Sequence, residues 1–116
     1  MDKEERYENR QWNDAVRDAK RAYDQFSKFD WKAWDGKPES AARHLRKALD
    51  DFSAAMTHVE KADVGKAQKG AVDDVNRGIK QLDEAVTALD DGNLDSAQRH
   101  YDNAANDFDK AAAILV

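Results

Sequence analysis

Two histidines are the residues of this 116-residue chain whose chemistry is easiest to name. Turned into a helical core, His44 and His100 could ligate a haem iron axially or share a metal ion. Each of them, however, directly precedes an apolar position of its predicted helix, Leu45 or Tyr101, which places it at the boundary with solvent. We therefore expect boundary side chains and no resident cofactor, and we keep haem or metal binding by His44 and His100 as the alternative function.

Residue patterns typical of enzymes are missing from the sequence. No serine lies in a nucleophile elbow, and no glycine-rich loop of the phosphate-binding type is present. The chain has no cysteine, and its few glutamates lack the Glu-x-x-His motif of di-metal bundles. These observations predict a protein that is not an enzyme.

Two tryptophans indicate a binding surface. Trp31 and Trp34 are three residues apart and point away from the apolar stripe of their predicted helix. Exposed tryptophans are frequent at binding hot spots, although both rings could instead fold across the end of a bundle as a lid. The remaining candidates for partner binding are an aromatic residue of the first helix and a short basic cluster: Tyr7, Arg43, Arg46 and Lys47.

The elements that must position these residues are helices. Apolar residues recur at alternating steps of three and four in each quarter of the chain, which predicts helices over 3–34, 38–62, 66–91 and 94–115. Asp-Gly pairs at 35–36 and 91–92 predict the ends of the first and third helices. Pro38 and Asn93 suit the starts of the second and fourth helices.

Connections this short require each helix to run antiparallel to the next. Alanines recur every seven residues along the predicted second and fourth helices, where small side chains allow helix backbones to approach closely: Ala41, Ala48, Ala55, Ala97, Ala104 and Ala111. The sequence therefore predicts an all-α fold, an antiparallel up-down-up-down four-helix bundle that forms a single domain over residues 1–116.

The two halves of the chain resemble each other at an offset of 56 residues. Between residues 15–55 and 71–111, 15 of 41 aligned pairs are identical, whereas the composition would give roughly four by chance. This predicts two tandem helical-hairpin repeats, at about 5–60 and 61–116, with pseudo-twofold symmetry. Because two such units already close one bundle, a monomer is favoured.

The composition of the chain limits the classes of partner that it can bind. The net charge of −5 argues against nucleic acid, and no apolar run approaches the ~20 residues of a membrane span. The polar start lacks the pattern of a signal peptide, so a cytoplasmic location is expected. We interpret the chain as a protein–protein interaction module, such as a small inhibitor, immunity or adaptor protein, that binds through a helix face or the end bearing Trp31 and Trp34.

Overall fold

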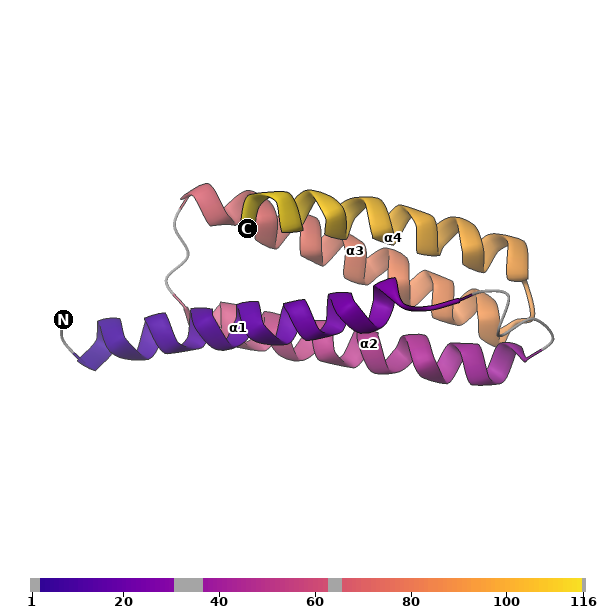
Figure 1. Cartoon of the computed structure of the whole chain (residues 1–116), viewed down its shortest axis with the longest axis horizontal. Helices are drawn as coiled ribbons and strands as arrows, with labels where there is room; N and C mark the ends of the chain where they lie inside the picture. The colour runs from indigo at the N-terminus through magenta and orange to yellow at the C-terminus, as the bar shows by residue number, and fades with distance from the viewer. Residues whose placement is uncertain (1–2, 31–36, 63–65, 116) are drawn as a thin grey trace.

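The computed structural model describes residues 3–30, 37–62 and 66–115. These residues form four α-helices: α1 (Lys3–Ser27), α2 (Pro38–Glu60), α3 (Lys66–Asp90) and α4 (Leu94–Leu115). Helices consecutive in the chain pack side by side, and the molecule is a rod of 54 × 20 × 20 Å (Figure 1). The predicted all-α class with four helices in up-and-down order is confirmed.

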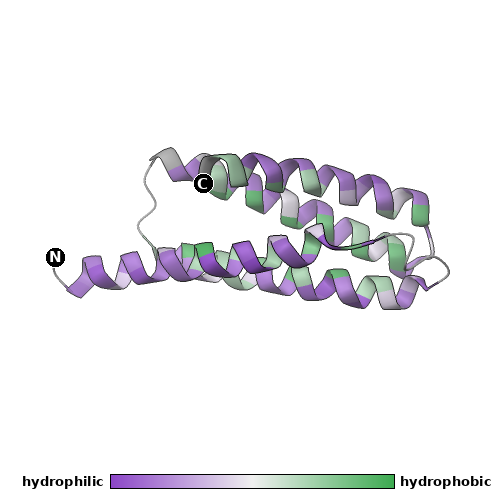
Figure 2. Cartoon of the chain, in the orientation of Figure 1, coloured by the Kyte–Doolittle hydropathy of each residue, from purple (hydrophilic) through white to green (hydrophobic). Residues whose placement is uncertain are grey.

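One apolar core contains side chains from all four helices. The hydrophobic residues of each helix gather on the sides that face the other helices, whereas the first turns of α1 are hydrophilic throughout (Figure 2). The six alanines at seven-residue spacing on α2 and α4 are at most 2% exposed, as the sequence predicts. Over the residues that are described, no helix has the length and apolar character that a bilayer crossing requires.

The turn between α3 and α4 follows the predicted turn chemistry. Gly92 adopts a φ of 77°, the left-handed conformation that ends many helices. The backbone N–H of Asn93 donates to the carbonyl of Ala88, and the Asn93 side chain accepts a 3.1 Å hydrogen bond from the N–H of Ser96. Asn93 thus caps α4. The matching Asp-Gly pair at 35–36 lies outside the described residues.

The first helix is shorter than the sequence predicts. It ends at Ser27, not near residue 34. In a continued helix the Phe26 carbonyl would accept the N–H of Asp30. Instead, that carbonyl accepts the N–H of Phe29 at 3.2 Å and the hydroxyl of Tyr101 at 2.5 Å. The side chain of Tyr101 therefore competes for the acceptor that the next helical turn would need.

The four helices do not pack equally closely. Contacts are most extensive between α3 and α4 and between α1 and α2, and they are few between α1 and α4. Along the α1–α4 side, polar bonds from two tyrosines join the helices: Tyr101 to the Phe26 carbonyl, and Tyr23 to the Asp109 carboxylate. Both bonds involve the C-terminal half of α1. Toward its N-terminus, α1 diverges from α4 (Figure 1).

Candidate functional site

The basic cluster predicted from the sequence lies near the start of α2 and is partly neutralised. Nη2 of Arg46 is 2.7 Å from Oδ2 of Asp90, at the end of α3. Nη2 of Arg43 donates a 3.4 Å hydrogen bond to Oγ of Ser40, while Lys47 is exposed. The Arg46 and Asp90 side chains are 47% and 48% exposed, so their ion pair contributes less than about 1 kcal/mol to stability.

The predicted binding residues are not brought together. Tyr7 lies near the start of α1, where the neighbouring Gln11 contacts His58 close to the end of α2. Twelve helical residues separate His58 from Arg46, a distance of about 18 Å along α2. Tyr7 is therefore remote from the basic cluster. Trp31 and Trp34 lie outside the described residues.

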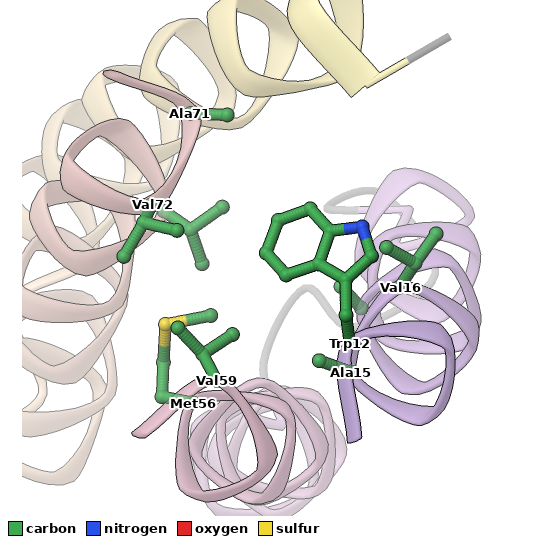
Figure 3. Close-up of a pocket in the computed structure, with 9 residues that line it drawn as sticks. Trp12, Ala15, Val16, Met56, Val59, Ala71 and Val72 are labelled. Carbon is green, nitrogen blue, oxygen red and sulfur yellow. The ribbon is translucent and has the colours of Figure 1, made fainter. Parts of the chain in front are cut away.

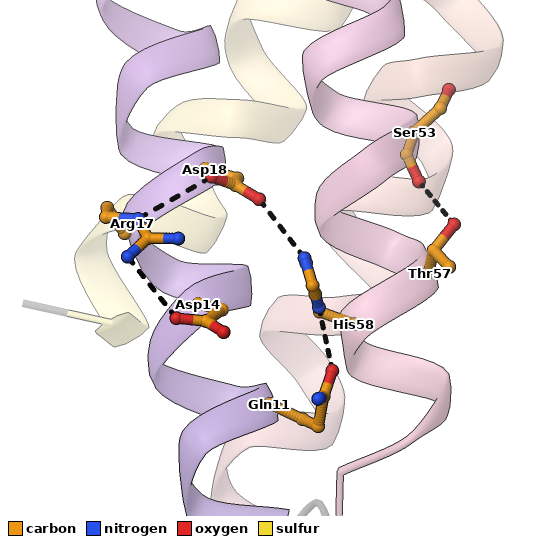
Figure 4. A network of polar contacts seen from close by, with 7 residues as sticks. All are labelled: Gln11, Asp14, Arg17, Asp18, Ser53, Thr57 and His58. Atoms are coloured by element: carbon orange, nitrogen blue, oxygen red, sulfur yellow. Dashed lines mark hydrogen bonds and ion pairs between the residues drawn. The ribbon is translucent and has the colours of Figure 1, made fainter.

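His58 and His100 lie between adjacent helices and are held there by polar side chains. Nδ1 of His58 is 2.7 Å from Oε1 of Gln11, and Nε2 is 3.5 Å from Oδ2 of Asp18 (Figure 4). Nδ1 of His100 is 2.9 Å from Oε1 of Gln81 and 3.0 Å from Oε2 of Glu84. His58 thus links α2 to α1, and His100 links α4 to α3.

His44 and His100 contact different parts of the bundle. The imidazole of His44 lies against the ring of Phe29, with centroids 5.7 Å apart, whereas His100 turns toward α3. Within the described ranges, no three histidine, aspartate or glutamate side chains gather in a way that could hold a metal ion. Haem or metal binding by this pair remains a prediction of the sequence, which a haemin titration of wild type and His44→Ala would test.

A patch of basic residues around Tyr7 lies where α1 extends beyond the described ends of its neighbours (Figure 1). Tyr7 is 48% exposed, the most exposed large apolar side chain among the described residues. We define the Tyr7 patch as four exposed residues that border one shallow hollow: Lys3, Arg6, Tyr7 and Arg10. Its three cationic side chains form no ion pair with any described residue.

Two apolar cavities lie beside the part of α1 that diverges from α4. The smaller, of about 20 Å³, is bounded by α1, α2 and α3. The indole of Trp12 projects into this space toward Val72 of α3, above Val59 of α2 (Figure 3). The larger, of about 220 Å³, lies between α1 and α4, and Val16 and Ala19 line both cavities.

Aromatic rings and small side chains shape the larger cavity. Its lining includes Phe52 and Phe108, whose rings stack with centroids 4.0 Å apart. Ala19 of α1 and Ala112 of α4 also line it, and alanine side chains leave the space between these helices open. Among the described residues of the lining, Lys20 is the one that is charged.

Sequence reasoning missed the charged part of the Tyr7 patch and both cavities. The patch had a signal, because Lys3, Arg6 and Arg10 recur at steps of three and four on one side of the helix. The cavities had none, since they depend on the separation of α1 from α4. Comparison with models of protein families, with curated proteins and with solved structures found no match to this chain.

Proposed function

We propose that this chain is a non-catalytic protein-interaction module that binds an acidic segment of another protein through the Tyr7 patch. The observation that carries the proposal is an exposed tyrosine flanked by three cations without ion-pair partners among the described residues. Tyrosine and arginine are enriched at protein–protein hot spots. A small inhibitor or adaptor protein is the specific form of this function that we favour.

The charges on the protruding turns are segregated in a way that opposes helix stability. Arg6 and Arg10 are four residues apart and share one face, while Glu4 and Glu8 share the opposite one, since two residues are about 200° apart around a helix. Like charges at this spacing each destabilise a helix by about 0.2–0.5 kcal/mol. An acidic partner would remove the repulsion between the arginines, so the arrangement favours binding.

Charge balance supports a protein partner over a polyanion. Helix α1 contains six basic and six acidic residues, so the net charge of −5 belongs to the rest of the chain. A long polyanion, such as a nucleic acid, would be repelled by that remainder, because its field extends over about 10 Å at moderate salt. A short acidic segment can contact the Tyr7 patch alone.

We also infer that the bundle arose from two tandem hairpin repeats with pseudo-twofold symmetry. The aligned residues Phe52 and Phe108 stack on each other, as equivalent residues near a twofold axis do. The second repeat has no full counterpart of the Tyr7 patch: Arg6 and Tyr7 align with Ala62 and Asp63, and only Arg10 aligns with a cation, Lys66. Such a difference between repeats fits a function acquired by one of them.

The test is affinity capture from the native cell extract with the full chain as bait. We expect Tyr7→Ala, and the double variant Arg6→Glu/Arg10→Glu, to lose an acidic protein that wild type retains, with unchanged helicity. The matched control is Lys80→Glu/Lys110→Glu, which makes the same change of charge at exposed positions of α3 and α4 and should retain the partner. The amount of partner that is captured should fall as the salt concentration is raised.

Two results would overturn this assignment. One is a partner that the Arg6→Glu/Arg10→Glu variant retains as well as wild type does. The other is a partner lost only by Trp31→Ala/Trp34→Ala, which would place recognition at residues 31–36, as the tryptophan spacing suggests.

A further inference from the structure

The cavity between α1 and α4 has the dimensions of a small ligand. Its volume is about 220 Å³. An engineered protein cavity of about 150 Å³ binds benzene, so by proportion this one accommodates about nine carbon atoms. Phe52 and Phe108 form an apolar floor, while Val16 and Ala112 belong to opposite walls. The body of a ligand that fills this space must therefore be apolar.

The polar groups beside the cavity indicate which charge a ligand should carry. The hydroxyl of Tyr23 is already committed, because it donates to Oδ1 of Asp109. Lys20 forms no ion pair with any described residue, even though Asp109 projects toward the same side of α1. Tyr23 thus holds the Asp109 carboxylate, and Lys20 is the one charged residue among the described residues that line the apolar space. A ligand with a single anionic group would complement it.

We propose that this cavity binds the anion of a medium-chain fatty acid. Its hydrocarbon chain lies between α1 and α4 on the rings of Phe52 and Phe108, and its carboxylate pairs with Lys20. The Tyr23–Asp109 and Tyr101–Phe26 hydrogen bonds hold α1 against α4 at one end of the cavity, so the chain enters from the opposite, divergent end. This site uses residues different from those of the Tyr7 patch and is independent of the proposed function.

The experiment is a titration of the full chain with nonanoate below its micelle concentration, followed by NMR. We expect saturable 1:1 binding that shifts signals of cavity residues such as Val16, Val75 and Ala112. Nonylammonium, which has the same chain length and the opposite charge, should bind at least about tenfold more weakly, the factor expected for one charge-assisted hydrogen bond. Phosphatidylcholine vesicles should not bind the protein.

Three cavity variants and a control separate the roles of charge and space. Lys20→Gln should weaken nonanoate binding about tenfold, and Lys20→Glu should reverse the preference in favour of nonylammonium. Ala112→Phe fills the cavity and should abolish binding of both ligands. Lys80→Gln, at an exposed lysine of α3, should bind nonanoate as wild type does.

Several results would overturn the proposal. Equal affinity for nonanoate and nonylammonium in wild type would remove the role of Lys20. Shifts that spread over all four helices without saturation would indicate detergent-like association, and binding to vesicles without binding to nonanoate would indicate a membrane surface. A photo-crosslinking residue in place of Ala112 that captures a second copy or another protein would identify a macromolecular occupant instead.

Discussion

The hydroxyl of Tyr101 in α4 donates a 2.5 Å hydrogen bond to the backbone carbonyl of Phe26 in α1. The two rings also stack, with centroids 4.2 Å apart. This pair joins helices that make few other contacts, and it occupies the carbonyl that would otherwise continue α1 beyond Ser27. One side chain therefore both closes this end of the bundle and ends the first helix.

Tyr101→Phe removes the hydrogen bond and keeps the ring. We expect the free energy of unfolding to fall by about 0.5–1.5 kcal/mol, the net contribution of one hydrogen bond. The amide of Phe29 should exchange faster with solvent, because the turn that ends α1 loses its anchor. Urea unfolding and hydrogen exchange measure the two effects, with the exposed Tyr7→Phe as control. Unchanged stability would show that the stacked ring alone holds α1 against α4.

Alkaline pH should destabilise the fold through the same two tyrosines that join α1 to α4. Burial, with a smaller contribution from the charge of Asp102, raises the pKa of Tyr101 to about 12. The hydrogen bond to Asp109, followed by burial, raises the pKa of Tyr23. In the unfolded chain both phenols ionise near pH 10, so their contribution to stability is complete below about pH 10 and is lost as the pH rises toward about 12.

Unfolding free energies measured between about pH 8 and pH 12 would test this sign. The wild type should lose stability steeply above about pH 10, and the Tyr23→Phe/Tyr101→Phe variant should show a shallower decline. Tyrosinate absorbance of the folded wild type should still be rising near pH 12, because the pKa of Tyr101 is raised to about 12. A decline of equal steepness in the double variant would contradict the prediction.

Much of the fold could be predicted from the sequence because each helix encodes its own buried side. Ala48 and Ala104 lie on predicted seams and are fully buried. Pro38 and Asn93 stand at the observed starts of α2 and α4, since cap chemistry is local. The end of α1 was predicted wrongly because it depends on Tyr101, 75 residues away in the chain.

The candidate sites were less predictable because they depend on relative helix positions. Tyr7 was named as a candidate because it is an aromatic residue of the first helix, but the patch around it is accessible because α1 extends past the described end of α2. Val16 and Ala19 have the periodicity of ordinary core residues. The cavity beside them exists because α1 diverges from α4, and no local pattern encodes that divergence.

Two glycines of α3 should respond oppositely to the same substitution. A Cβ atom at Gly78 would overlap the ring of Phe108, which is 2% exposed and stacked on Phe52, so the ring has little room to move. Overpacking of this kind costs about 1–3 kcal/mol, more than the gain of about 1 kcal/mol from helix propensity. We therefore expect Gly78→Ala to lower the free energy of unfolding.

Gly70 is the matched control because it lies in the same helix with its backbone exposed. Gly70→Ala should raise the free energy of unfolding by about 0.5–1 kcal/mol, since alanine has the higher helix propensity and the position is exposed. Urea unfolding of both variants beside wild type decides the sign. If both substitutions stabilise the protein, the ring of Phe108 can shift without a cost in free energy. The close approach of α4 to α3 would then not require the absence of a side chain at Gly78.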